Sequence, residues 1–120
     1  DPRVRAALPI VIRAGDAAAV GTRVSARLAA GGRRWEVGSL AGLEILRMRS
    51  EAAGVPASEL DVTADWPLYT LNREALAQVR DLGVRRAVTS PEDDGENLCQ
   101  RLRLDAGAME VLVLQFTPLF

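Results

Sequence analysis

Apolar and polar residues occur in alternating blocks along this chain. Five short runs rich in valine, isoleucine, leucine and alanine are typical of β-strands, and they lie at residues 8–12, 35–37, 60–64, 87–89 and 109–116. Four longer runs between them carry charges on one side, which predicts amphipathic helices at residues 17–30, 42–53, 73–82 and 92–104. Most of the strand runs are continuously apolar, so we expect strands that are buried on both faces.

The helix boundaries carry signals of their own. Glycines at or just past the ends of the helical runs can adopt the left-handed conformation that closes a helix. These glycines are Gly31, Gly54, Gly83 and Gly107. Polar residues able to accept backbone N–H hydrogen bonds precede three helices, and the predicted caps are Asp16, Asn72 and Ser90. Pro91 and two acidic residues follow Ser90, which makes this helix start the most strongly marked.

Strands that alternate with helices through short loops predict an α/β fold of alternating βα units with a parallel sheet. The pattern leaves two arrangements open, an arc of a barrel or a small open doubly wound sheet. The 120 residues are about half the ~250 residues of a full eight-stranded βα barrel, and we expect residues 1–120 to form a single domain. The first residue is Asp1 rather than Met, so we expect a piece of a longer protein.

Composition excludes several classes of function. The net charge of -1 lacks the positive excess of a DNA-binding module, and no apolar run is long enough for a membrane span. The chain has no histidine and a single cysteine, Cys99, so it lacks the parts of a Ser-His-Asp triad, a zinc site or an intrachain disulfide. We expect a cytoplasmic protein. Glycine-rich motifs for dinucleotides or phosphates are also missing, and no cofactor is expected within this chain.

Ligands of parallel α/β sheets bind outside the carboxyl ends of the strands, so residues where a strand passes into a helix are the candidates for a binding site. The predicted substrate-binding residues are Glu36, Asp65, Trp66, Asn72 and Glu92. Glu36 and Asp65 are the stronger candidates, because an acid in or at the end of a buried strand is costly unless it is paired or used. Asn72 has a structural alternative as a helix cap, and Glu92 as a partner of a helix dipole.

One segment resembles a known family. The stretch ADWPLYTLNREALAQVRDLGVRRAVTSPED is similar to the signature of the collagenase-like peptidases, the unassigned-type peptidase family numbered thirty-two. The matching elements are Ala64-Asp65-Trp66, Leu71-Asn72, Leu82-Gly83 and Ser90-Pro91-Glu92. In the final stretch MEVLVLQFTPLF, the acid Glu110 and the step Pro118-Leu119 match the family's following strand. Residues 59–120 carry the clearer resemblance.

The resemblance implies part of a TIM-barrel-like fold and a longer enzyme. Members of the family were named as proteases, whereas others act in RNA or ubiquinone hydroxylation with an iron–sulfur cluster held by cysteines beyond the Pro-Leu step. Such a cluster is therefore expected only in the full-length protein. Gln115 stands where many members carry a histidine, and Cys99 matches no cluster ligand. We expect these 120 residues alone to be inactive as a protease.

Two functional classes remain. In the first, the chain is part of a peptidase-family hydrolase or hydroxylation enzyme and binds a peptide or an RNA-related substrate. In the second, it is a noncatalytic binding or dimerisation module. Because a partial barrel would expose sheet edges and an apolar face, we expect the isolated chain to self-associate.

Overall fold

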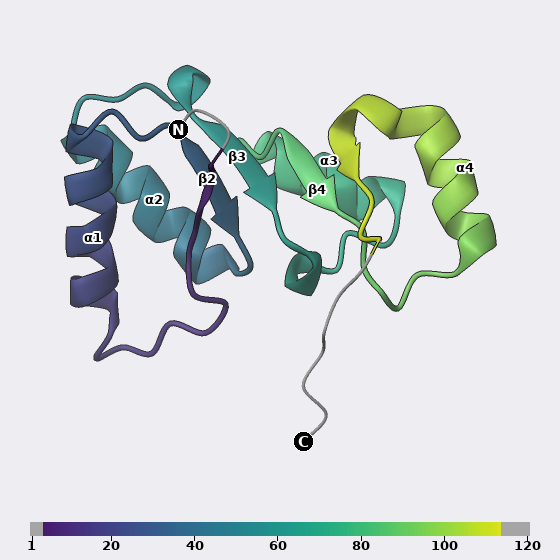
Figure 1. The fold of residues 1–120 in the computed structure, drawn as a ribbon, viewed down its shortest axis with the longest axis horizontal. Coiled ribbons are helices and arrows are strands. Elements are labelled where there is room, and N and C mark those ends of the chain that lie inside the picture. The colour runs from purple at the N-terminus through teal and green to yellow at the C-terminus, as the bar shows by residue number, and fades with distance from the viewer. Residues whose placement is uncertain (1–3, 114–120) are drawn as a thin grey trace.

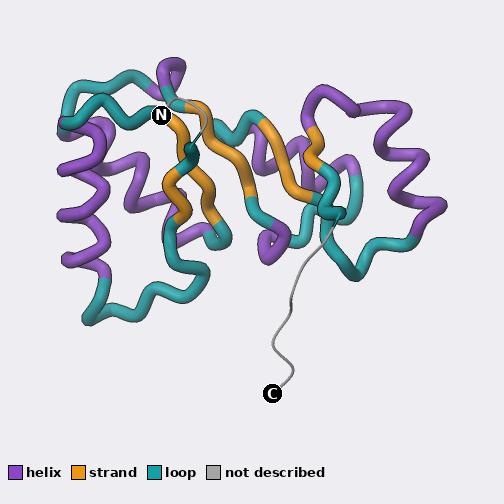
Figure 2. Tube along the Cα trace, viewed as in Figure 1, coloured by secondary structure: helices purple, strands orange, loops and turns teal. Residues whose placement is uncertain are grey.

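The computed structural model describes residues 4–113, in which helices and strands alternate (Figure 1, Figure 2). The strands are β1 (Ala6–Ala7), β2 (Arg34–Val37), β3 (Asp61–Ala64), β4 (Arg86–Val88) and β5 (Met109–Glu110). The helices are α1 (Ala17–Ala29), α2 (Leu40–Ala52), α3 (Arg73–Asp81) and α4 (Gly95–Asp105). Short 3-10 helices are η1 (Ala57–Glu59), η2 (Trp66–Leu68) and η3 (Ala106–Ala108). The predicted α/β fold is confirmed.

The five strands form one parallel sheet in the order β1-β2-β3-β4-β5, so each strand pairs with its neighbour in the sequence. Trp35 is in register with Val62, and Ala87 with Met109, and these side chains face the helices. They form a single core with apolar residues from all four helices; the members contributed by α1, α2 and α3 include Val24, Leu28, Leu46, Leu76 and Val79. The helices therefore cover one and the same face of the sheet (Figure 1).

The opposite face of the sheet is buried only in part, at Thr63 of β3, which is 0% exposed, and the prediction of strands buried on both faces is wrong for β2 and β4. In β2, Trp35 and Val37 are 1% and 0% exposed, whereas Arg34 and Glu36 between them are partly exposed. Successive side chains of a strand point to opposite faces, so the alternation leaves one apolar and one charged face. Because all the helices lie on the apolar side, nothing among residues 4–113 covers the charged side fully.

The edge strands depart most from the predicted bounds. Residues 8–12 form a loop, and β1 ends at Ala7. The last sheet hydrogen bond on this side is donated by the Leu8 N–H to the Glu36 carbonyl, at 2.9 Å. The strand predicted at 109–116 is confined to Met109–Glu110 within the described part, and residues 114–116, with Gln115, lie outside the described residues.

Two helices begin elsewhere than predicted. Helix α2 starts two residues early at Leu40, because the Ser39 hydroxyl caps it by accepting the Gly42 N–H at 3.2 Å. Helix α4 starts at Gly95, and Asp94 rather than Ser90 is its N-cap. The Ser90 hydroxyl instead accepts the Glu92 N–H at 3.1 Å and closes a turn before the helix.

The structure confirms some of the other predicted helix-boundary residues and not others. Asn72 caps α3 by accepting the Ala75 N–H at 2.8 Å, as predicted, whereas Asp16 occupies the N-cap of α1 without a side-chain hydrogen bond. Three of the four predicted helix-closing glycines have positive φ, with values of 82° at Gly31, 66° at Gly54 and 94° at Gly83. Gly107 is not among them and lies inside η3.

Candidate functional site

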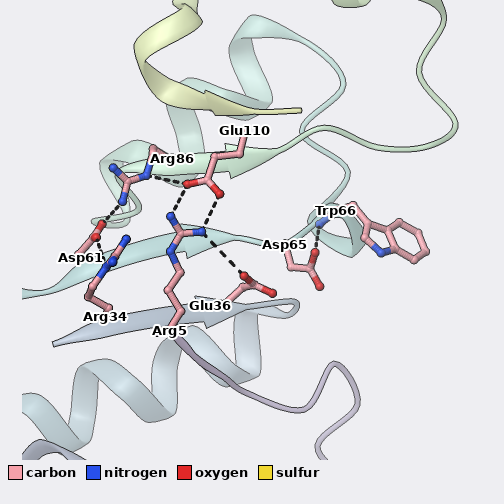
Figure 3. A network of polar contacts seen from close by, with 8 residues as sticks. All are labelled: Arg5, Arg34, Glu36, Asp61, Asp65, Trp66, Arg86 and Glu110. Atoms are coloured by element: carbon pink, nitrogen blue, oxygen red, sulfur yellow. Dashed lines mark hydrogen bonds and ion pairs between the residues drawn. The ribbon is translucent and has the colours of Figure 1, made fainter. Parts of the chain in front are cut away.

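The open face of the sheet carries a network of ionised side chains that sequence reasoning missed (Figure 3). Its members are Arg5, Arg34, Glu36, Asp61, Arg86 and Glu110. They come from β2, β3, β4, β5 and the residue before β1. Three acids and three arginines alternate, so the network is neutral overall.

One half of the network joins the last strand to the middle of the sheet. The Arg86 guanidinium lies 2.9 Å from Glu110 and 2.5 Å from the second acid, Asp61. Asp61 also accepts a hydrogen bond from Arg34 Nε at 3.1 Å. Burial by itself would raise the Asp61 pKa, but the two arginines outweigh burial and lower that pKa.

The other half joins the two edges of the sheet. Arg5 donates from both terminal nitrogens to Glu110, with an Nη1–Oε2 distance of 2.6 Å, and it lies 4.0 Å from Glu36. Hydrogen bonding to Arg5 lowers the pKa of Glu110. Four strand steps of about 4.8 Å in a flat sheet would hold these edges ~19 Å apart, farther than the two side chains reach. The sheet is therefore curved, with the charged face on its concave side.

Glu36 and Asp65 form a second feature at the carboxyl end of the sheet. Glu36 is the penultimate residue of β2, and Asp65 directly follows β3, whose last residue Ala64 is in register with Val37. Burial raises the pKa of Glu36, and the negative charge of Asp65 raises it further, against the opposing effect of Arg5. Two carboxylates thus lie close enough to repel each other, an arrangement that favours a positively charged or hydrogen-bond-donating ligand group.

The remaining predicted site residues lie around this pair without joining it. The ring of Trp66 points away from the ion-pair network (Figure 3) and meets the Tyr69 ring edge-on, with centroids 6.0 Å apart. Asn72 is exposed and its side chain caps α3. Glu92 is exposed in the turn after β4. The structure therefore brings together Glu36 and Asp65 and places the other three at the rim.

A local signal for the missed network does exist in the sequence. Strand β2 has charged residues at alternate positions, Arg34 and Glu36, and one charged residue, Asp61 or Arg86, opens each of the next two strands. This period-two pattern is typical of a sheet with one polar face. The pairing partners are not visible in the sequence, because Arg5 and Glu110 are separated by 105 residues.

Two hollows lie away from these carboxylates. One of about 360 Å³ is formed by β1 and α1, with Leu8, Val20 and Trp35 in its wall, and another of similar volume is bordered by Arg27, Arg33 and Arg34. Within residues 4–113, no three or more histidine, cysteine or acidic side chains come together as ligands for a metal ion. In the same part of the chain, no helix has the length and apolar character that crossing a membrane requires.

The fold and site thus define an α/β protein whose parallel sheet curves around a neutral ion-pair network, with two carboxylates at the carboxyl end of its strands. A scan against protein-family models found no match, and searches of curated proteins and of solved structures found none either. Membership of the collagenase-like peptidase family therefore stays a prediction from the sequence.

Proposed function

We propose that this chain is an arc of a βα barrel of the collagenase-like peptidase type, and that it contributes part of a peptide-binding mouth. The single observation that carries the binding role is the pairing of Glu36 and Asp65 at the carboxyl ends of neighbouring strands, where burial and like charge raise the pKa of Glu36. Ligands of barrels bind at this end of the sheet.

The register of the strands supports the barrel. The residues Ala7, Glu36, Thr63 and Arg86 share one row across β1 to β4. Arg5 stands two residues before this row, and Glu110, which pairs with Val88, stands two residues beyond it. Their contact therefore advances four residues over four strand steps, or one residue per strand, which is the stagger of an eight-stranded barrel with a shear of eight.

Electrostatics favours a peptide over RNA as the ligand. Glu36, Asp65 and Glu92 put negative charge on the strand-end side, and the positive charge of Arg5 is neutralised by Glu110. A phosphate backbone gains affinity from free arginines or lysines and is repelled by carboxylates. Two neighbouring carboxylates attract the amine or guanidinium of a peptide, and such a group forms charge-assisted hydrogen bonds with carboxylates. Catalytic groups are not assigned to this chain, and its proposed part in the parent enzyme is binding.

Calorimetric titration of the 120-residue chain with short peptides tests this function. We expect a tetrapeptide containing arginine to bind at least tenfold more tightly than the same peptide with neutral citrulline. Asp65→Asn should remove most of that preference, because asparagine keeps the hydrogen bond from the Trp66 N–H, now 2.8 Å long, but loses the charge. Glu59→Gln, at the opposite end of β3, is the matched control and should change nothing.

The pH dependence gives an independent check. The ionised form of Glu36 attracts the cation, so affinity should rise as the pH rises through the raised pKa of Glu36. Glu36→Gln should flatten this dependence. Equal affinity for the arginine and citrulline peptides, or tighter binding of an RNA oligonucleotide at physiological salt, contradicts the proposal.

Self-association remains the second proposal, and exposed apolar residues at both sheet edges favour it. Ile10 and Val11 beside β1 are 47% and 71% exposed, and Val111 and Val113 beyond β5 are 45% and 91% exposed. Edge strands with apolar surroundings are ready to pair with another chain. Light scattering at micromolar concentration should give at least the mass of a dimer, and the mass of a monomer would contradict this.

A cytoplasmic location completes the proposal. Cys99 is a free and exposed thiol, a state that the reducing cytoplasm maintains. Fractionation of cells expressing the chain should place it with the cytoplasmic proteins.

A further inference from the structure

The side chain of Asn97 connects two loops at the carboxyl end of the sheet. Its Nδ2 donates to the Leu71 carbonyl at 3.0 Å and to Asp93 Oδ1 at 2.6 Å. Leu71 belongs to the segment between β3 and α3, and Asp93 to the segment between β4 and α4. An asparagine amide has two N–H donors, so one side chain can serve both acceptors.

Asp93 is fixed in place independently of Asn97. Its Oδ2 accepts a hydrogen bond from Arg101 Nη1 at 2.7 Å, and the two side chains are 3% and 4% exposed. A charge pair buried to this degree holds its geometry, because separating the partners leaves an uncompensated charge out of water. The second carboxylate oxygen of Asp93 therefore presents a fixed acceptor to Asn97.

The loop that Asn97 reaches needs such a restraint. Tyr69 adopts φ 48° and ψ 49°, a left-handed conformation that is unfavourable for a residue with a side chain. The Leu71 N–H donates to the Tyr69 carbonyl at 2.8 Å, so the strained residue and the tethered carbonyl belong to one tight turn. Strained residues persist where the surrounding contacts hold them. This turn follows the 3-10 helix η2, which Asp65 caps and which begins at Trp66.

We propose that Asn97 is a positioning residue for the strand-end site. It ties the Leu71 carbonyl to α4 and thereby fixes the β3–α3 loop, so that Asp65 keeps its place beside Glu36 and Trp66 its place at the rim. Asn97 touches neither carboxylate of the pair and acts through the loop. The inference rests on the proposed function and adds a residue of α4 to it.

Tryptophan fluorescence reports on the loop directly. Trp35 is 1% exposed in the core, whereas Trp66 is half-buried in the loop, so acrylamide quenches mainly Trp66. Asn97→Ala should raise the quenching constant about twofold and weaken binding of the arginine peptide about fivefold or more. Asn97→Gln keeps an amide donor and should restore part of both.

Asp94→Ala is the matched control. It removes the cap of the same helix, where Asp94 Oδ1 accepts the Asn97 N–H at 2.8 Å, and leaves the amide contact to Leu71 in place. We expect it to lower the melting temperature without changing the quenching of Trp66 or the affinity for the peptide. If the two variants change quenching and affinity in proportion to their loss of stability, Asn97 is merely structural and the proposal falls.

The two proposals fail in different ways. A wild-type chain that binds no peptide overturns the proposed function. Unchanged quenching in Asn97→Ala overturns the positioning role, whatever the wild-type chain binds.

Discussion

Replacing Arg5 with methionine removes the ion pair that joins the two edges of the sheet and keeps the aliphatic stem of the side chain. Arg5 and Glu110 are 19% and 32% exposed, between a buried and a surface pair. Exposed pairs couple by about 0.2–1 kcal/mol, and breaking a buried pair costs about 3–5 kcal/mol. In the variant Glu110 still has Arg86 as a partner, at 2.9 Å in the wild type, so its charge is not left uncompensated. We therefore expect a coupling below that of a fully buried pair, at about 1–2 kcal/mol.

A double-mutant cycle measures this coupling. The chains compared are wild type, Arg5→Met, Glu110→Gln and the double variant, each unfolded by urea and followed by circular dichroism. We expect a coupling free energy of about 1–2 kcal/mol; a loss of that size in Arg5→Met lowers the melting temperature of a 120-residue chain by about 4–8 °C. Added salt should weaken the coupling only slightly, because partly buried pairs are poorly screened.

An exposed pair on α2 is the control for this cycle. Arg47 and Glu44 are 59% and 54% exposed and lie 2.7 Å apart, so the same cycle with Arg47→Met and Glu44→Gln should give a clearly smaller coupling than that between Arg5 and Glu110. A coupling between Arg5 and Glu110 no larger than that of the control pair would refute the reasoning. The curvature of the sheet would then not depend on the contact between its edges.

Three further predictions follow from burial, backbone geometry and the raised pKa of Glu36. The folded chain binds the proton of the Glu36 carboxyl group more tightly than the unfolded chain does, so the stability that this group contributes is lost as the pH rises from about 4.5 through the raised pKa. The melting temperature of Glu36→Gln, measured relative to wild type, should therefore be higher at pH 7 than at pH 4. Leu46→Ala should cost about 2–5 kcal/mol in urea unfolding at a site 1% exposed, and Leu40→Ala, at 60%, less than about 0.5 kcal/mol. Gly83→Ala should lose about 1–2 kcal/mol by the same assay because φ is 94°, whereas equal effects in Gly83→Ala and Gly107→Ala would contradict this.

Local signals in the sequence predicted those parts of the fold that local physics determines. Asn72 caps α3, and Gly31 and Gly83 close helices, because a cap or a left-handed residue acts on its immediate neighbours. The start of α4 was predicted wrongly because two such signals compete within five residues. Ser90 and Asp94 can each cap a helix, and the buried pair between Asp93 and a residue of α4 favours the later start.

The candidate site, too, could be predicted from the sequence only in part. That Glu36 and Asp65 lie at strand ends follows from the alternation of strands and helices, and the sequence placed both there. Their mutual repulsion and their relation to Arg5 depend on which strands pair and in which register, which no short stretch encodes. Likewise, the contact of Asn97 with Leu71 joins residues from different βα units, separated by 26 residues.

The contact between the sheet edges has a consequence for how the chain folds. Every strand pairs with its neighbour in the sequence, and the residues paired in each ladder are 22–29 positions apart, so the ladders can form one after another. Arg5 and Glu110, 105 residues apart, can meet only when the sheet has already assembled and curved. Their contact should therefore be absent from the folding transition state, and Arg5→Met should speed unfolding while leaving the folding rate nearly unchanged. An ion pair of this kind forms late in folding, and it therefore sets the lifetime of the folded state rather than the rate of folding.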